Sequence, residues 1–295
     1  FVIRQYSPAR TIGGGHVLEA GNRKHKRYKQ DVCEQLAIKD KGTPGELVLA
    51  KLQEACQPLA LAEVARLIGI SETEVHNALE SLGSEVKSCV LDGNAFWFTF
   101  SYFNRLGNEI RDILMEFHRK FPLRPGLPKE ELKSRVFSSW NSKLFTAFLM
   151  ALDSQGILTM GNSVFLADFQ PEPQGKMATT AIQISKDYAT AGLTPPDWQT
   201  VMEKYKLEKA DAEELLQYFL RQGSLVKTPP NFYFAQGSLQ AAKEQVLSLL
   251  SEKGEISPAD VKDLLGTSRK FLIPILEYFD AQKITRRVGD KRIKF

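Results

Sequence analysis

Two stretches far apart in the chain repeat one pattern: EVARLIGIS at residues 63–71 and DVKDLLGTS at residues 260–268. Each has apolar residues at helical spacing, then a glycine, then a serine two positions later. Each glycine is a predicted helix end, because a left-handed terminal residue favours glycine. Ser71 and Ser268 then stand at the N-cap of a second helix, where a side-chain oxygen accepts a free backbone N–H. The repeat predicts a helix–turn–helix at both places.

Two short β-like runs around a turn follow each second helix, and the pattern occurs four times. The four stretches are EVKSCVLDGNAFWFTF (85–100), ILTMGNSVFLADF (157–169), SLVKTPPNFYFAQ (224–236) and ITRRVGDKRIKF (284–295). Their turns are rich in Gly, Asn, Asp and Pro, which is typical of β-hairpins. A further helix precedes each helix–turn–helix, so each unit has three helices and a β-hairpin wing. We therefore expect a mainly α fold with small β-hairpins (α+β), built from four tandem winged-helix domains.

The expected domain boundaries follow from these repeats. The winged helices are predicted at residues 23–102, 103–170, 171–236 and 237–295. The polar, proline-containing QPEPQGK at 170–176 indicates a linker between two pairs. Residues 1–22 contain strand-like runs around a Gly-rich bend, are too short for a domain, and are expected to be the end of a β-barrel. Because the sequence starts without Met, we expect the chain to begin inside a longer protein.

Composition excludes several classes of protein. With 43% hydrophobic and 25% charged residues the chain is globular, and no apolar run reaches the roughly 18 residues of a membrane span. Three widely spaced cysteines, Cys33, Cys56 and Cys89, favour a reducing cytoplasm over a disulfide framework or a zinc site. The sequence has no phosphate-loop motif, no metal-like histidine spacing and no evident catalytic set. We expect no catalytic residue, no metal site and no enzyme activity.

Positive charge concentrates in the last 29 residues. They hold eight Lys and Arg against three Asp and Glu, whereas the whole chain has a net charge of +4. The second helix of the fourth unit opens SRKFL, while SETEV and EKADAEEL open those of the first and third units. Arg269 and Lys270 oppose the positive end of the helix dipole, at about 0.3–1 kcal/mol each. Pro274 lies inside the same helix, although the apolar positions keep the helical period. Local rules broken together often mark a functional site.

The fourth hairpin is basic as well. Its cations are Arg286, Arg287, Lys291, Arg292 and Lys294, against Asp290 alone. Strand alternation places Arg286 and Arg287 on opposite faces. Because a basic helix start and a basic wing coincide only in this unit, residues 237–295 are predicted to bind nucleic acid, with a merely solvated face as the alternative.

Two other stretches carry weaker signals. The basic NRKHKRYK at 22–29 is interpreted either as an RNA contact or as an exposed linker. The aromatic FWFTFSYF at 96–103 is predicted to form wing and inter-domain core in preference to a base-stacking platform.

Both ends of the chain resemble known families. TSRKFLIPILEYFDAQKITRRVGDKRIKF at 267–295 resembles the C-terminal end of the bacterial selenocysteine-specific translation elongation factor, where a Ser-Arg-Lys helix start, an internal proline and a TRRVGD wing occur together. FVIRQYSPARTIGGGHVLEA at 1–20 resembles the end of the third, elongation-factor-Tu-type barrel domain of translational GTPases. The middle units match in architecture more than in motif.

The resemblance implies a function. The chain would bind the messenger hairpin of the selenocysteine insertion element and tether the GTPase and selenocysteinyl-tRNA-binding part to the messenger during UGA recoding. GTP and magnesium would belong to the absent GTPase domain, so no cofactor is expected here. The partners implied are the mRNA stem-loop, the ribosome and, through the absent domains, selenocysteinyl-tRNA, with the chain a monomer in the cytoplasm. The implied RNA-binding residues are Ser268, Arg269, Lys270, Arg286, Arg287 and Arg292.

Two alternatives stay open. A winged-helix DNA-binding transcription regulator would present a polar, base-reading helix, but here Phe271, Leu272 and Pro274 stand early in that helix and three of the four units are not basic. A protein-interaction scaffold would use the acidic surfaces of the first three units.

Overall fold

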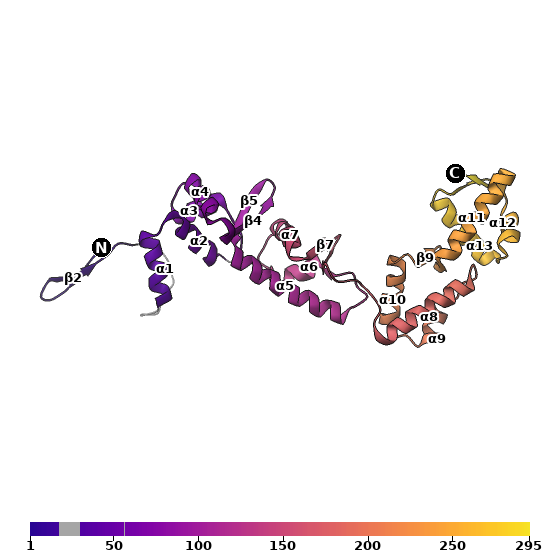
Figure 1. The fold of residues 1–295 in the computed structure, drawn as a ribbon, viewed down its shortest axis with the longest axis horizontal. Coiled ribbons are helices and arrows are strands. Elements are labelled where there is room, and N and C mark those ends of the chain that lie inside the picture. Colours follow the sequence, from indigo (N-terminus) through magenta and orange to yellow (C-terminus); the bar gives the residue numbers. More distant parts are fainter. Residues whose placement is uncertain (18–29, 56) are drawn as a thin grey trace. The chain divides into compact units, whose positions relative to one another are not determined.

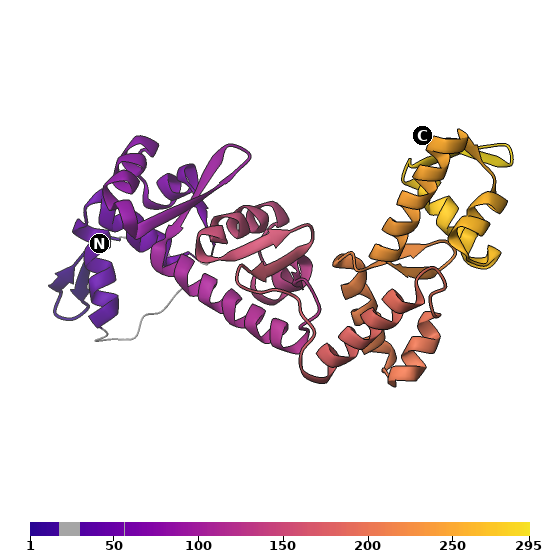
Figure 2. The ribbon, with the colours of Figure 1, turned by 45° about the vertical axis from the view of Figure 1, so that its right-hand side comes forward.

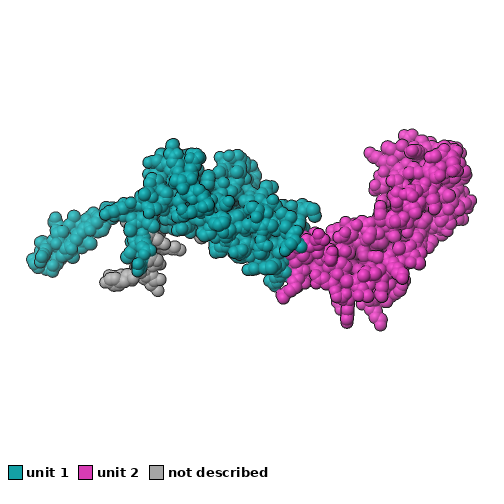
Figure 3. Space-filling model, viewed as in Figure 1, with its two compact units in different colours: residues 1–116, 126–168 teal, residues 117–125, 169–295 magenta. Residues whose placement is uncertain are grey.

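Helices make up most of the described chain, and its strands form small antiparallel sheets (Figure 1). The computed structural model describes residues 1–17, 30–55 and 57–295. The chain divides into two compact units, one of residues 1–116 and 126–168 and the other of residues 117–125 and 169–295 (Figure 3). The expected mainly helical α+β class is confirmed. None of the described helices combines the length and the apolar character that a bilayer crossing needs.

The N-terminal end is a hairpin. β1 (Val2–Gln5) pairs antiparallel with β2 (Arg10–Gly14), and every residue of both strands is exposed. The hairpin therefore contributes no buried core. The assignment of residues 1–22 to a β-barrel stays a prediction. Residues 18–22 and the basic stretch 22–29 lie outside the described residues.

The next group of elements is a helical cluster closed by a three-stranded sheet. It contains α1 (Gln30–Lys41), α2 (Pro44–Glu54), β3 (Leu59–Ala60), α3 (Leu61–Ile68), α4 (Glu72–Leu82), the 3-10 turn Gly83–Glu85, β4 (Val86–Leu91) and β5 (Asn94–Thr99). The strand order is β3-β5-β4. The helices meet over a core that includes the fully buried Val48, Val64 and Val75. α4 starts as predicted: the Glu74 amide donates to the Ser71 hydroxyl at 3.2 Å, and the Ser71 amide donates to the Glu74 carboxylate at 2.9 Å.

A long helix opens the second group. The elements are α5 (Phe100–Lys120), β6 (Leu127–Pro128), α6 (Lys129–Val136), α7 (Ser142–Ala151), the 3-10 turn Leu152–Gln155, β7 (Ile157–Met160) and β8 (Ser163–Leu166). The side chains of Phe98 in β5, Phe103 in α5 and Phe148 in α7 are buried together, and their ring centroids lie 5.4–5.7 Å apart. The aromatic run at 96–103 therefore supplies core between the first two groups, as predicted.

The second unit contains a third group of elements. These are α8 (Gly175–Ala191), α9 (Trp198–Tyr205), α10 (Lys209–Arg221), β9 (Leu225–Thr228) and β10 (Phe232–Ala235). The core contains Ile184, Tyr188, Val201 and Leu215, all at most 1% exposed. Leu123, from the loop after α5, packs into the same core. That contact explains why residues 117–125 belong to the second unit.

The fourth group follows β10 directly (Figure 2). Its elements are α11 (Gln236–Lys253), β11 (Glu255–Ile256), α12 (Pro258–Leu265), α13 (Arg269–Ala281), β12 (Thr285–Val288) and β13 (Lys291–Lys294). The strand order is β11-β13-β12. At the start of α12, Lys253 and the capping residue Ser257 hold the pKa of Asp260 well below its usual range. Phe234 of β10 is fully buried in this fourth core, so the third and fourth groups share a strand.

Candidate nucleic-acid interface

The start of α13 holds the first group of predicted site residues. α12 ends at Gly266, whose φ of 61° is left-handed, as the repeat predicts. Ser268 follows at the N-cap with an extended backbone, and α13 begins at Arg269. Ser268, Arg269 and Lys270 are all exposed. The structure therefore places these three residues together at an open helix start.

The Ser268 side chain does not cap α13 in the way that Ser71 caps α4. Ser71 exchanges hydrogen bonds with Glu74, whereas the Ser268 hydroxyl makes no cap hydrogen bond. The position equivalent to Glu74 is Phe271, which has no carboxylate to return a bond. The expectation that the Ser268 side chain accepts a helix N–H is therefore wrong. Within the described residues, no N-cap side chain satisfies the first amides of α13.

Burial of apolar side chains sustains α13 despite its unfavourable start. The buried positions follow the helical spacing i, i+3, i+4 and i+7: Leu272, Ile275, Leu276 and Phe279. Each such side chain contributes about 1.5–3 kcal/mol when fully buried, which together exceeds ~0.3–1 kcal/mol per opposing charge and ~3 kcal/mol for a helical proline. The helix continues through Pro274, as predicted. The two cations at its start are therefore tolerated by the fold and do not stabilise it.

The hairpin β12–β13 carries the second group. Its register pairs Arg286 with Ile293 and Arg287 with Arg292. Because successive side chains on a strand alternate in direction, Arg286 and Arg287 lie on opposite faces, as predicted. Both are exposed, and Nε of Arg287 donates to the Gly289 carbonyl in the turn at 2.9 Å.

Arg292 does not belong to the open surface. It is 5% exposed, and its Nε donates to the Asp280 carboxylate at 3.0 Å. The second carboxylate oxygen of Asp280 accepts the Thr285 hydroxyl at 2.5 Å. A buried cation needs a partner, and Asp280 near the end of α13 provides it. This burial corrects the prediction that Arg292 contacts RNA: its charge attaches the wing to the helix.

The remaining ion pairs of the fourth group show which of its described basic side chains have no acidic partner. Lys291 pairs with Glu255 of β11, and this interaction raises the pKa of Lys291. None of the ion pairs among the described residues includes Arg269, Lys270 or Arg286. Uncompensated positive charge therefore remains at the start of α13 and on the outer part of the wing.

The helix-start and wing clusters are attached to different parts of the module. The contact between Arg292 and Asp280 holds the wing about 16 Å along the helix axis from Arg269. Among the described residues, no hydrogen bond or ion pair joins the 268–270 cluster to Arg286 or Arg287. A folded polynucleotide has the size to engage both clusters, whereas a single phosphate has not.

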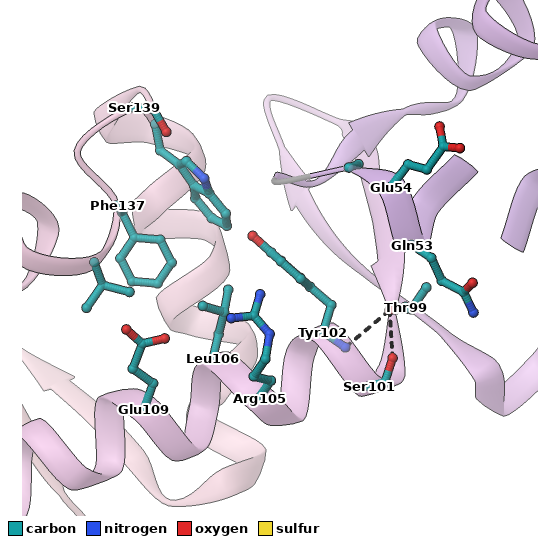
Figure 4. Close-up of a pocket in the computed structure, with 13 residues that line it drawn as sticks. Gln53, Glu54, Thr99, Ser101, Tyr102, Arg105, Leu106, Glu109, Phe137 and Ser139 are labelled. Atoms are coloured by element: carbon teal, nitrogen blue, oxygen red, sulfur yellow. Dashed lines mark hydrogen bonds between the residues drawn. The ribbon is translucent and has the colours of Figure 1, made fainter. Parts of the chain in front are cut away.

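A separate cavity lies in the first unit (Figure 4). It has a volume of about 580 Å³ and lies between the end of α2, the first turns of α5 and the loop after α6. The Arg105 guanidinium lies 5.1 Å from the centroid of the Tyr102 ring. The hydrogen bonds drawn there join Thr99 to Ser101 and to the Tyr102 amide, which start α5 (Figure 4). No group of three His, Cys, Asp or Glu that would hold a metal ion occurs in the part of the chain that the structure describes.

Two family models match this chain. Both are described as "Elongation factor SelB, winged helix". One matches residues 111–164, which include α6, α7, β7 and the start of β8, and the other matches residues 248–293, which include α12, α13 and β12. The helix start with the uncompensated charge lies inside the second of these matches.

Two solved structures match this chain at low sequence identity. A crystal structure of the bacterial selenocysteine-specific elongation factor EF-Sec is 19% identical with a TM-score of 0.49, over 100% of this chain and 44% of that chain. The mRNA-binding domain of elongation factor SelB from E. coli, solved in complex with SECIS RNA, is 24% identical with a TM-score of 0.34, over 39% of this chain and 96% of that chain.

A curated protein is similar in sequence to nearly the whole of this chain. The selenocysteine-specific elongation factor of Desulfomicrobium baculatum is 30% identical over 301 residues, which cover 99% of this chain and 46% of that protein. The chain thus spans about half the length of this relative. Residues 111–164 and 248–293 thus match winged helices of elongation factor SelB, and nearly the whole chain is similar in sequence to a selenocysteine-specific elongation factor.

Proposed function

We propose that this chain binds a hairpin of messenger RNA through residues 237–295, as the RNA-binding region of a selenocysteine-specific elongation factor. The observation that carries the proposal is the exposed, uncompensated basic start of α13 within a segment that matches a SelB winged helix. The name of the Desulfomicrobium relative supports the selenocysteine-specific role.

The chemistry of α13 favours an RNA ligand. An anion at a helix start accepts hydrogen bonds from the first backbone amides and interacts favourably with the helix dipole. A phosphate of RNA would therefore offset the repulsion between the positive helix end and the charges of Arg269 and Lys270. Structured RNA presents phosphates and unstacked loop bases, which arginine side chains bind by hydrogen bonding and stacking. We assign Ser268, Arg269 and Lys270 to the loop of the hairpin. Arg286 and Arg287 are assigned to its backbone, from opposite faces of the wing.

We also propose that the chain comprises four winged helices, at 23–102, 103–170, 171–236 and 237–295, after the end of a β-barrel at 1–22. An antiparallel hairpin following two helices in each of the four ranges supports this division. The first three domains would act as a spacer, holding the messenger hairpin at a distance from the domains that carry selenocysteinyl-tRNA.

The remaining assignments concern the whole protein. GTP and magnesium would bind to its GTPase domain, and the ribosome and selenocysteinyl-tRNA would engage the assembled factor during UGA recoding. This chain would itself act without a cofactor, without a catalytic residue and as a cytoplasmic monomer.

The test is a titration of the chain with RNA hairpins of varied loops and with duplex DNA of matched length. The variant is Arg269→Ala, and the control is Arg66→Ala, which removes one exposed arginine from α3 of the first unit. Loss of a good base contact corresponds to about 1–3 kcal/mol, or roughly 5- to 150-fold in Kd. Arg269→Ala should show this loss for the preferred hairpin, and Arg66→Ala should bind like the unaltered chain.

Two results contradict the proposal. Duplex DNA bound as tightly as every hairpin would favour a DNA-binding regulator. Equal affinity of the Arg269→Ala and Arg66→Ala chains for all RNAs would remove α13 from the interface.

A further inference from the structure

The hairpin β9–β10 is covered on both faces by different cores. Val226, Phe232 and Phe234 pack with the fourth core, whereas Leu225 and Tyr233 pack with the third. The two sets alternate along the strands, as side chains on opposite faces of a hairpin do. The hairpin of the third group is therefore also a structural part of the fourth.

One residue of this hairpin reaches the predicted RNA-binding site. Phe232 is the first residue of β10, next to the turn, and its register partner is Thr228. Its ring centroid lies 5.2 Å from that of Phe271, and the rings meet edge to face at 66°. Phe271 is the third residue of α13, so the tip of the third hairpin contacts the first turn of the fourth domain's second helix.

Lys270 lies over both rings. Its Nζ is 5.5 Å from the centroid of the Phe232 ring and 5.3 Å from that of the Phe271 ring. These distances fall within the roughly 6 Å limit of a cation–π interaction. The Lys270 side chain remains exposed, so its ammonium group is held by two aromatic rings while it faces solvent.

The two rings restrict the Lys270 ammonium group, and this affects the entropy that is lost when it binds a phosphate. A lysine side chain has about 2 kcal/mol of rotamer entropy, much of which is lost when a phosphate fixes it. Rings that already restrict the ammonium reduce the entropy lost on binding, which is the effect of preorganisation. One of the two rings comes from outside residues 237–295.

We propose that Phe232 is a positioning residue for RNA binding: it holds the Lys270 ammonium for a phosphate of the RNA hairpin, so the third and fourth domains build the site together. This inference rests on the proposed function and extends it, because the bound phosphate is that of the same RNA. A residue of the third domain thereby contributes to the affinity of the fourth domain for RNA.

The experiment compares variants of the full chain. Phe232→Leu removes the ring and keeps an apolar side chain, Phe232→Tyr keeps the ring, and Lys270→Met removes the charge. Tyr233→Leu is the matched control, because it removes a ring from the adjacent position on the opposite face of the same strand. Each variant is titrated with the preferred RNA hairpin at low salt, and the chemical shifts of the Lys270 ε-methylene protons are followed by NMR.

A cation–π contribution of about 0.5–1 kcal/mol corresponds to roughly a 2- to 5-fold rise in Kd for Phe232→Leu. Phe232→Tyr and Tyr233→Leu should bind like the unaltered chain. In a Lys270→Met background the effect of Phe232→Leu should disappear, since the ammonium that the ring positions is gone. The ring-current shift of the Lys270 ε-protons should decrease in Phe232→Leu and persist in Phe232→Tyr.

Each contrary outcome has a distinct meaning. If Phe232→Leu binds RNA like the unaltered chain, or if its loss is the same with and without the Lys270 charge, the positioning role is wrong while the proposed function stands. If the unaltered chain binds no RNA hairpin, the proposed function fails and this inference fails with it.

Discussion

The buried ion pair of Arg292 and Asp280 can be tested directly, because it is expected to stabilise the attachment of the β12–β13 hairpin to α13 and not to bind RNA. The Arg292 side chain is 6% exposed and that of its partner Asp280 is 24% exposed. Removing one member of a buried ion pair typically costs about 3–5 kcal/mol, because the other charge is left unpaired. Asp280→Ala leaves the more buried charge, that of Arg292, without its partner, so the loss of unfolding free energy should fall within that range.

The reverse change should cost less. Arg292→Met keeps most of the buried side-chain volume, and the Asp280 carboxylate that remains is partly solvated and still accepts the Thr285 hydroxyl. We expect about 1–3 kcal/mol, the usual penalty for a polar group that loses its partner. The double variant Asp280→Ala/Arg292→Met should be more stable than the sum of the two single losses predicts, since neither charge is then left alone.

The assay is hydrogen exchange of the full chain, resolved to peptides that cover α13 and the β12–β13 hairpin. A loss of 3 kcal/mol in opening free energy accelerates exchange roughly a hundredfold. RNA-hairpin affinity, measured at a temperature where each variant is folded, should change only a few-fold for Arg292→Met. If Arg292→Met exchanges like the unaltered chain but loses RNA binding at least as severely as Arg269→Ala, Arg292 is an RNA contact and the role assigned to the buried pair is wrong.

Three further outcomes are expected. Ser71→Ala should lower the unfolding free energy of the first unit by about 0.5–2 kcal/mol, whereas Ser268→Ala, which removes no cap hydrogen bond, should leave exchange of α13 nearly unchanged; equal losses in the two would contradict the difference in capping. Phe234→Ala should destabilise the fourth core by about 3–5 kcal/mol in denaturant unfolding, although Phe234 belongs to the third hairpin, and a loss below about 1 kcal/mol would show that the cores are independent. Burial raises the pKa of the Cys89 thiol to about 11, so at pH 8 it stays protonated and a thiol reagent should modify exposed Cys33 much faster; comparable labelling rates, followed by mass spectrometry, would show that Cys89 is accessible.

Local signals in the sequence were sufficient for the repeating parts of the fold. The spacing of apolar residues, the glycine that ends a helix and the serine that starts the next are read within about ten residues, and they predicted the helix–turn–helix at 63–71 and 260–268 correctly. The hairpin turns and the concentration of basic residues in the last segment are equally local. Strand alternation also placed Arg286 and Arg287 on opposite faces, because the period of a strand is fixed by its backbone.

Only the tertiary structure decided what each basic residue contacts. Alternation shows that two residues face opposite ways, but not which face meets a helix, so the sequence could not distinguish buried Arg292 from its exposed neighbours. The contact between Lys270 and Phe232 joins residues of two adjacent segments across a shared hairpin, and no periodicity within either segment encodes it. Charge and helical period are properties of neighbouring residues, whereas burial and pairing depend on which elements pack together. The sequence by itself therefore located the basic module, and the packing of β10 and β13 determined which of its cations remain available to a ligand.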